Sequence, residues 1–267
     1  MSKSVSKAPR LAATILLLRS GAPVTFLMMK RHSKARFMAN TYVFPGGGVD
    51  DADATVAPSL SLGAFRIAAL RELAEEAGLT LTPSGGLTQV TNVNVKIDAT
   101  SAATLTPFAH WITPEAEKYR YDTWFFSAVV PSGSEKVPLT ADPKEVADLC
   151  WITPKEAFER HHNVTSSFAL PPPTYLIMHY LSQFRTSEDV HKDLLAKGYN
   201  DPQRVPCVLA VLELTDEGFP KYMRLRSGST HLPDGRYTFP VRVGDALLEM
   251  TAVVGAGEPV LGQISKL

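Results

Sequence analysis

Three glutamates, Glu72, Glu75 and Glu76, follow one another at spacings i, i+3 and i+4 in the run Arg71–Leu79. On an α-helix this spacing places all three carboxylates on one face. Like charges so placed repel one another by roughly a few tenths of a kcal/mol per pair, and a bound divalent cation would offset that repulsion. The alternative interpretation is a solvated helix face, because acidic pairs are common on exposed helices.

The residues around these glutamates predict the elements that position them. An apolar strand is expected at Tyr42–Phe44, followed by a glycine loop at Gly46–Gly48. The helix that carries the glutamates is expected at Ala64–Ala77, and Gly78 provides its C-terminal stop. A strand, a glycine turn and a helix with aligned carboxylates form a specific combination.

This combination resembles the Nudix box, in which a glycine and a glutamate precede the motif Arg-Glu-apolar-x-Glu-Glu-x-Gly-apolar. Arg71–Leu79 agrees with the second half of the box at every defined position. In the first half, counting from Gly47 places Asp53 where the box has a glutamate. Seventeen residues then separate Asp53 from Arg71 where the box has seven. We therefore expect an insertion at about residues 54–63, and its small, mildly apolar residues predict a loop.

One branch of this family, the peroxisomal acyl-coenzyme A diphosphatases, is similar to the chain in further places. That branch also has an insertion between the glycine loop and the Arg-Glu helix. The segments His110–Glu115 and Tyr119–Phe126 resemble its W-I-T-P and R-F-D-T-x-F-F motifs. The C-terminal tripeptide Ser265-Lys266-Leu267 resembles the signal that the peroxisomal import receptor binds, so we expect a peroxisomal location.

The family resemblance implies a Mg²⁺ or Mn²⁺ site at which water attacks a diphosphate. It assigns catalysis and metal binding to Glu72, Glu75 and Glu76, with the Gly46 carbonyl as a backbone ligand. Arg71 is expected to be structural and to pair with a carboxylate of the box.

Nudix enzymes often recruit another acid from a later loop. Our candidate for that further metal ligand is Glu145, with Asp142 and Asp148 as the alternatives.

The branch resemblance implies coenzyme A and its acyl esters as substrates, with adenosine 3′,5′-bisphosphate and (acyl) 4′-phosphopantetheine as products. A coenzyme A-type element before the glycines is matched in part, and it implies that Arg31 and Arg36 contact substrate phosphates. Two alternatives stay open. One is a Nudix hydrolase for another diphosphate, such as NADH or a nucleotide sugar. The other is a non-catalytic module that binds a nucleotide.

Composition and charge fit a globular enzyme. The 267 residues carry zero formal net charge, which gives no reason to expect a nucleic-acid partner. The apolar run Leu11–Leu18 is too short to span a membrane. Residues 1–49 contain no acid but eight basic residues: Lys3, Lys7, Arg10, Arg19, Lys30, Arg31, Lys34 and Arg36. Cys150 and Cys207 lie in apolar runs and are expected to be buried, reduced thiols.

The predicted fold class is α/β: a Nudix α/β/α sandwich with a mixed sheet and a β-rich C-terminal extension. Residues 1–10 are expected to be a flexible basic segment, 11–197 the Nudix domain and 198–264 the extension, before the tripeptide at 265–267. Further strands are predicted at Leu11–Leu18, Val24–Lys30, Phe108–Ile112, Asp122–Val130, Glu145–Ile152, Val205–Leu212 and Tyr237–Val253. Further helices are predicted at Pro154–His161, Pro173–Phe184 and Glu188–Lys197.

Overall fold

The structure is a computed structural model that describes residues 8–90, 96–115, 117–163, 165–209, 211–214, 220–225, 235–243 and 246–254. Residues 1–7 of the predicted basic segment lie outside the described residues, and so does the Ser265-Lys266-Leu267 tripeptide.

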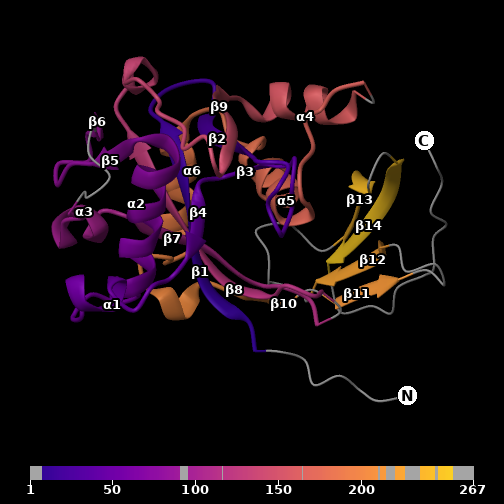
Figure 1. The fold of residues 1–267 in the computed structure, drawn as a ribbon, viewed down its shortest axis with the longest axis horizontal. Coiled ribbons are helices and arrows are strands. Elements are labelled where there is room, and N and C mark those ends of the chain that lie inside the picture. The colour runs from indigo at the N-terminus through magenta and orange to yellow at the C-terminus, as the bar shows by residue number, and fades with distance from the viewer. Residues whose placement is uncertain are drawn as a thin grey trace.

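A mixed eight-stranded sheet forms the centre of the molecule (Figure 1). Its main path is β10 (Cys207–Leu209), β7 (Thr106–Ile112), β8 (Tyr121–Val130), β1 (Arg10–Arg19), β2 (Thr25–Arg31) and β3 (Tyr42–Val43). Strand β4 (Gly46–Gly48) pairs with β1, and β9 (Val146–Ile152) pairs with β2. Strand β1 runs parallel to β8 and antiparallel to β2, so the predicted mixed sheet is confirmed.

Helices cover both faces of this sheet, because its central strands are apolar on both sides. In β1, Leu16 and Leu18 face one core, and Ile15 and Leu17 face the other. The first core includes residues of α4 (Pro154–His162), α5 (Pro172–Leu181) and α6 (Ser187–Ala196). The second includes residues of α2 (Gly63–Ala77) and α3 (Ala99–Ala103). The predicted α/β/α sandwich is therefore confirmed.

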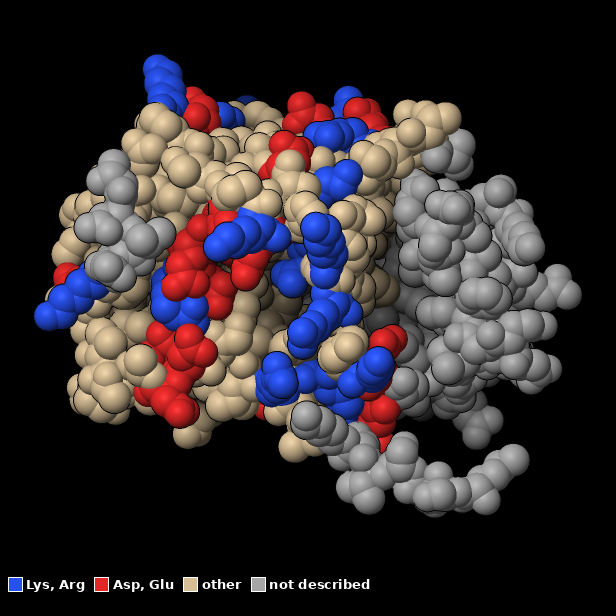
Figure 2. All heavy atoms as spheres, in the orientation of Figure 1, with Lys and Arg blue, Asp and Glu red and all other residues tan. Residues whose placement is uncertain are grey.

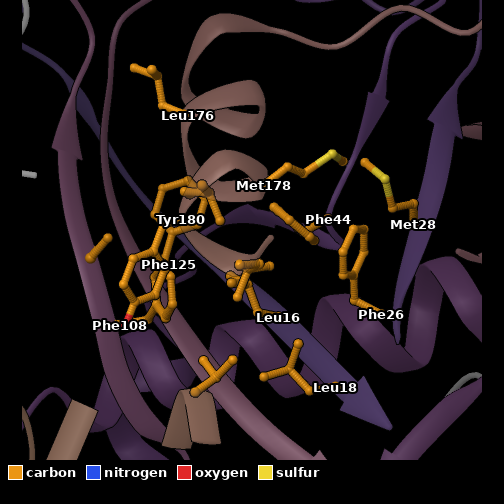
Figure 3. Packing of buried hydrophobic residues seen from close by; sticks show 14 of the residues in the cluster. Leu16, Leu18, Phe26, Met28, Phe44, Phe108, Phe125, Leu176, Met178 and Tyr180 are labelled. Carbon is orange, nitrogen blue, oxygen red and sulfur yellow. The ribbon is translucent and has the colours of Figure 1, made fainter. Parts of the chain in front are cut away.

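Figure 3 shows the first core from close by. Met178 and Tyr180 of α5 point toward Phe44, Leu16 and Phe125.

Strand β1 pairs with different strands at its two ends, and this change of partner leaves room for a site. At one end of β1, Leu18 pairs with Phe26 of β2, whereas at the other end Ala12 pairs with Gly48 of β4. The prediction of a plain glycine loop was wrong, since Gly46–Gly48 is a strand. Glycine has low strand propensity, and here the pairing with β1 overrides it.

Two predicted strands of the C-terminal region were wrong in extent. Val205–Leu212 is divided between β10, which pairs with β7, and β11 (Val211–Leu214), which belongs to a second sheet. Tyr237–Val253 is divided into the antiparallel strands β13 (Gly235–Val243) and β14 (Ala246–Val254). The second sheet has the order β11-β12-β14-β13, with β12 at Pro220–Leu225. The domain boundary near residue 198 stays a prediction, and β10 extends the main sheet beyond it.

The insertion packs on the carboxylate helix. The loop prediction for residues 54–63 was wrong in part, because α1 (Asp53–Val56) forms one helical turn. A β-carbon on Gly63 would lie 2.1 Å from the Ala57 carbonyl oxygen, so the insertion folds directly against the start of α2.

A buried arginine holds the insertion in place. Arg66 of α2 donates to the carbonyl oxygen of Ser61 at 2.9 Å and also to that of Leu105.

The predicted ends of two helices are confirmed. Gly78 caps α2 in the left-handed conformation, with φ 65° and its N–H directed to the Ala74 carbonyl oxygen. Thr153 caps α4 through a capping box with Glu156, and Pro154 is in the first turn.

The remaining short elements complete the chain: β5 (Leu79–Leu81), β6 (Leu87–Gln89), η1 (Ser134–Lys136) and η2 (Pro202–Arg204).

The burial predicted for the two cysteines was wrong. Cys150 in β9 is half-buried, and Cys207 is exposed because β10 is an edge strand. Both are free thiols. Among the described residues, no helix has the length and apolar character needed to cross a membrane.

We expect Leu16→Ala to lower the free energy of unfolding by about 2–5 kcal/mol, because Leu16 is fully buried in the central strand. Leu11 lies on the same strand with 49% of its surface exposed, and Leu11→Ala is the matched control with an expected change of about 0.5 kcal/mol or less. Urea denaturation measures both values. Equal losses for the two variants would contradict the burial of Leu16 in the core.

Candidate active site

Helix α2 directs two of its three predicted glutamates into a cavity on the other side of the sheet. Glu72 and Glu76 line this cavity and are only 9% and 3% exposed. Glu75 lies at the solvent side, where about half of its side chain is exposed. Glu72 and Glu76 therefore face the cavity, whereas Glu75 is not among the residues that line it.

The glycine strand β4 lies between α2 and the cavity. Because its residues have no side chains, the carboxylates of Glu72 and Glu76 can reach the cavity past it. The Gly46 N–H donates to Glu76 Oε2 at 2.8 Å. A β-carbon on Gly47 would lie 2.4 Å from the Glu72 carboxyl carbon, and one on Gly46 would lie 2.4 Å from the Ala13 carbonyl oxygen. Any side chain at these two positions would push β4 away from β1 or from α2.

Arg71 joins the glycine strand, the insertion and the glutamates. Its Nε and Nη2 donate to the two carboxylate oxygens of Asp53, each at 3.1 Å. Its Nη1 contacts Glu72 at 2.9 Å and Glu75 at 3.0 Å, and Nη2 also donates to the Gly48 carbonyl oxygen at 2.7 Å. The expectation that Arg71 pairs with a carboxylate of the box is confirmed.

Asp53 is thus the acid that Arg71 engages at the position where the box has a glutamate. It is 3% exposed and accepts the Asp50 N–H at 2.9 Å. None of residues 54–63, all of which the structure describes, lines the cavity. The insertion therefore supports the helix and does not shape the cavity wall.

Burial makes the two inward glutamates difficult to ionise. It raises the pKa of Glu72 to about 7, although the guanidinium of Arg71 acts in the opposite direction. Burial also raises the pKa of Glu76 well above its ordinary value, and the neighbouring Glu72 raises it further. The Gly46 N–H and Arg31 only partly oppose this rise. The site is therefore short of positive charge.

Glu145, the later acid predicted from the sequence, lies in the same cavity. Its charge contributes to the raised pKa values of both Glu72 and Glu76. The two alternatives are placed elsewhere. Asp148 accepts a hydrogen bond from the Tyr42 hydroxyl at 2.6 Å, and Asp142 accepts the Lys144 N–H at 2.9 Å outside the cavity.

The donor set fits a divalent cation of the magnesium type, since it consists of carboxylate and carbonyl oxygens around excess negative charge. In the described part of the chain, no three His, Cys, Asp or Glu side chains are already arranged to hold a metal ion. Arg71 Nη1 contacts Glu75 at 3.0 Å, and Glu75 does not line the cavity. A metal would therefore be held first by Glu72, Glu76, Glu145 and the Gly46 carbonyl.

The two predicted arginines line the cavity opposite the carboxylates. Arg31 ends β2, and its Nε donates to the Phe37 carbonyl oxygen at 3.1 Å. Arg36 follows in the loop before β3. In Figure 2, acidic side chains gather on the side of α2 and basic side chains gather across from them, with a hollow between.

Sequence reasoning missed two walls of this cavity, which has a volume of about 740 Å³. One is the segment 169–174, which includes the first turn of α5 and is fixed where the Ala169 carbonyl oxygen accepts the Tyr42 N–H at 2.7 Å. The run Pro171–Pro173 was its only sequence signal, because consecutive prolines stiffen a chain. The other wall is formed by Thr113, Pro114, Glu117 and Tyr119. The segments that resemble the family branch include residues of this wall, but the resemblance assigned them no role.

Comparison with known proteins agrees with this geometry. Residues 8–169 match the model of the family described as "NUDIX domain". The chain is 32% identical over 190 residues to "Putative nudix hydrolase 7" of Caenorhabditis elegans, which covers 65% of the chain and 61% of that protein. It is 25% identical over 265 residues to "Acyl-coenzyme A diphosphatase NUDT19" of Homo sapiens, covering 72% of the chain and 68% of that protein.

A solved structure also has this fold. The Nudix hydrolase from Alicyclobacillus acidocaldarius superposes with a TM-score of 0.56 at 22% identity, over 70% of the chain and 97% of that protein. More than half of the chain matches the family model, and Gly46, Gly47, Glu72 and Glu76 of the box line one cavity. The chain therefore belongs to the Nudix family.

Proposed function

We propose that the protein is a metal-dependent diphosphatase that cleaves coenzyme A and acyl-coenzyme A. The products would be adenosine 3′,5′-bisphosphate and (acyl) 4′-phosphopantetheine. The observation that carries this proposal is that Glu72, Glu76 and Glu145 line one cavity together with Arg31 and Arg36. The similarity to acyl-coenzyme A diphosphatases of three vertebrates, at 23–25% identity, supports the choice of substrate.

Different residues of the chain have different roles in the hydrolysis of a diphosphate. A bound divalent cation, Mg²⁺ or Mn²⁺, supplies charge neutralisation of the phosphoryl oxygens and a more acidic water. Glu76, Glu145 and the Gly46 carbonyl would hold that cation, with Glu75 as a further ligand. Glu72 is a ligand or the group that orients or deprotonates the attacking water. Arg31 and Arg36 bind and orient the anionic substrate.

A single experiment tests the substrate. Purified protein with acetyl-coenzyme A and Mg²⁺ or Mn²⁺ should release adenosine 3′,5′-bisphosphate, detected by chromatography, and a chelator should stop the release. NADH in a parallel reaction tests the alternative substrate class. Faster cleavage of NADH would favour that alternative, and no cleavage of any diphosphate would favour a non-catalytic module.

We expect Glu76→Gln to lower kcat by at least about a hundredfold, because the amide cannot supply the negative charge that a cation needs. The fold should remain, because the amide oxygen can still accept the Gly46 N–H. Glu159→Gln is the matched control, since Glu159 is exposed on α4 and does not line the cavity. Retained activity in Glu76→Gln would contradict the assignment of the site.

Glu145→Gln extends the same test. It should weaken Mn²⁺ binding, measured by calorimetry, whereas Asp142→Asn should leave it unchanged because Asp142 lies outside the cavity.

We also propose a peroxisomal location, which rests on the resemblance of Ser265-Lys266-Leu267 to an import signal. With a fluorescent protein fused at the N-terminus, the chain should colocalise with a peroxisomal marker. Removal of the three residues should make the fluorescence diffuse. Diffuse fluorescence before the removal would contradict the proposal.

A further inference from the structure

The cavity continues past the carboxylates to a second end that the proposed mechanism does not use. This distal end is formed by Trp111 of β7 and by Pro114, Glu117 and Tyr119 of the loop that follows it. Trp111 is buried, Glu117 is half-buried and Tyr119 is at the surface. The distal end is therefore an aromatic compartment that contains one carboxylate.

Strand pairing gives the separation between the two ends. Gly48 of β4 pairs with Ala12 of β1, Ala12 pairs with Thr123 of β8, and Thr123 pairs with Trp111 of β7. All four residues line the cavity. Three strand spacings separate Gly48 from Trp111, or about 14 Å. A ligand whose diphosphate lies beside the carboxylates can thus reach the distal end only with an arm of about that length.

Charged side chains are distributed unevenly between the carboxylate end and the distal end of the cavity. Of the described residues that line the cavity, the lysines and arginines are Arg31 and Arg36, and both lie on the wall between β2 and β3. The described residues that line the distal end include the carboxylate of Glu117 and no cation. The Arg120 guanidinium lies outside the lining, where its Nε donates to the Thr113 carbonyl oxygen at 3.1 Å. Burial raises the pKa of Glu117, as expected for a carboxylate in a poorly solvated position. A second phosphate placed beside Glu117 would be repelled.

The loop that carries Glu117 is held in position before any ligand arrives. The Thr113 N–H donates to the Tyr121 carbonyl oxygen at 2.9 Å, and the Glu117 N–H donates to the Pro114 carbonyl oxygen at 3.1 Å. Within the described residues, no group donates to the Glu117 carboxylate. Its oxygens are therefore available to accept an amide N–H or a hydroxyl from a ligand.

We infer that the distal end binds the 4′-phosphopantetheine arm of the substrate, and that the adenosine 3′,5′-bisphosphate half lies on the arginine wall. The inference rests on the proposed function. The pantetheine chain has about as many backbone atoms as four extended residues, which span about 14 Å. Its amide and hydroxyl groups suit Glu117, and it carries no charge beyond the phosphate at the reacting end. The adenosine half carries an additional phosphate and matches Arg31 and Arg36.

Binding of the two product halves to the full chain tests this orientation. Calorimetry with 4′-phosphopantetheine and with adenosine 3′,5′-bisphosphate compares the wild type with Glu117→Ala. We expect the variant to bind 4′-phosphopantetheine about tenfold more weakly, because it loses one hydrogen bond to a charged acceptor. Its affinity for the bisphosphate should stay within about twofold. In turnover, KM for coenzyme A should rise while kcat changes little.

The matched control is Glu115→Ala, which removes an exposed carboxylate from the same loop at a position outside the cavity. It should leave the binding of both halves unchanged. The opposite orientation makes the opposite prediction, since removal of the Glu117 charge would then strengthen binding of the bisphosphate. That result, or unchanged binding of 4′-phosphopantetheine, would overturn the inference.

The proposed function is tested separately from the orientation, because it is contradicted when the wild type does not cleave coenzyme A. A wild type that cleaves coenzyme A but does not bind 4′-phosphopantetheine would overturn the inferred orientation and leave the proposed function standing.

Discussion

The close contact between the carboxylates of α2 and the backbone of β4 is the constraint on which the rest of the site depends. Glu76 accepts the Gly46 N–H, and Glu72 leaves no room for a β-carbon at Gly47. The helix packs on one face of the sheet, yet these two side chains reach a cavity on the other face. This is possible because β1 pairs at that end with the short glycine strand β4 and not with β2.

This arrangement has an electrostatic cost that explains the residues around it. Two carboxylates in a poorly solvated position destabilise the folded chain unless hydrogen bonds and cations compensate them. Arg71 compensates from the α2 side, where buried Asp53 fixes its guanidinium with two parallel hydrogen bonds. Arg31 contributes from the opposite wall of the cavity. The remaining deficit of positive charge is the physical reason for a divalent cation at this position.

The sequence predicted those parts of the fold whose signals are local. The aligned glutamates and the stop at Gly78 identified α2. The nearly continuous apolar run within Asp122–Val130 identified a central strand. Gly46–Gly48 was missed as a strand because its pairing depends on β1, more than thirty residues away in the chain. The exposure of Cys207 depends on its place at the edge of the sheet, and residue composition carries no information about that. The inward turn of Glu72 and Glu76, but not Glu75, depends on tertiary packing in the same way.

The insertion shows how a family pattern can be interrupted without loss of its geometry. Residues 54–63 lengthen the segment between Asp53 and Arg71, but the two side chains still meet at 3.1 Å. Gly63 lies against Ala57, and Arg66 is anchored to the Ser61 carbonyl oxygen, so the added residues return the chain to the start of α2. The shorter side chain of an aspartate is sufficient because the chain on both sides of it packs against α2. The box residues therefore meet in space although their spacing in the sequence differs, because the insertion closes on Gly63 at the start of α2.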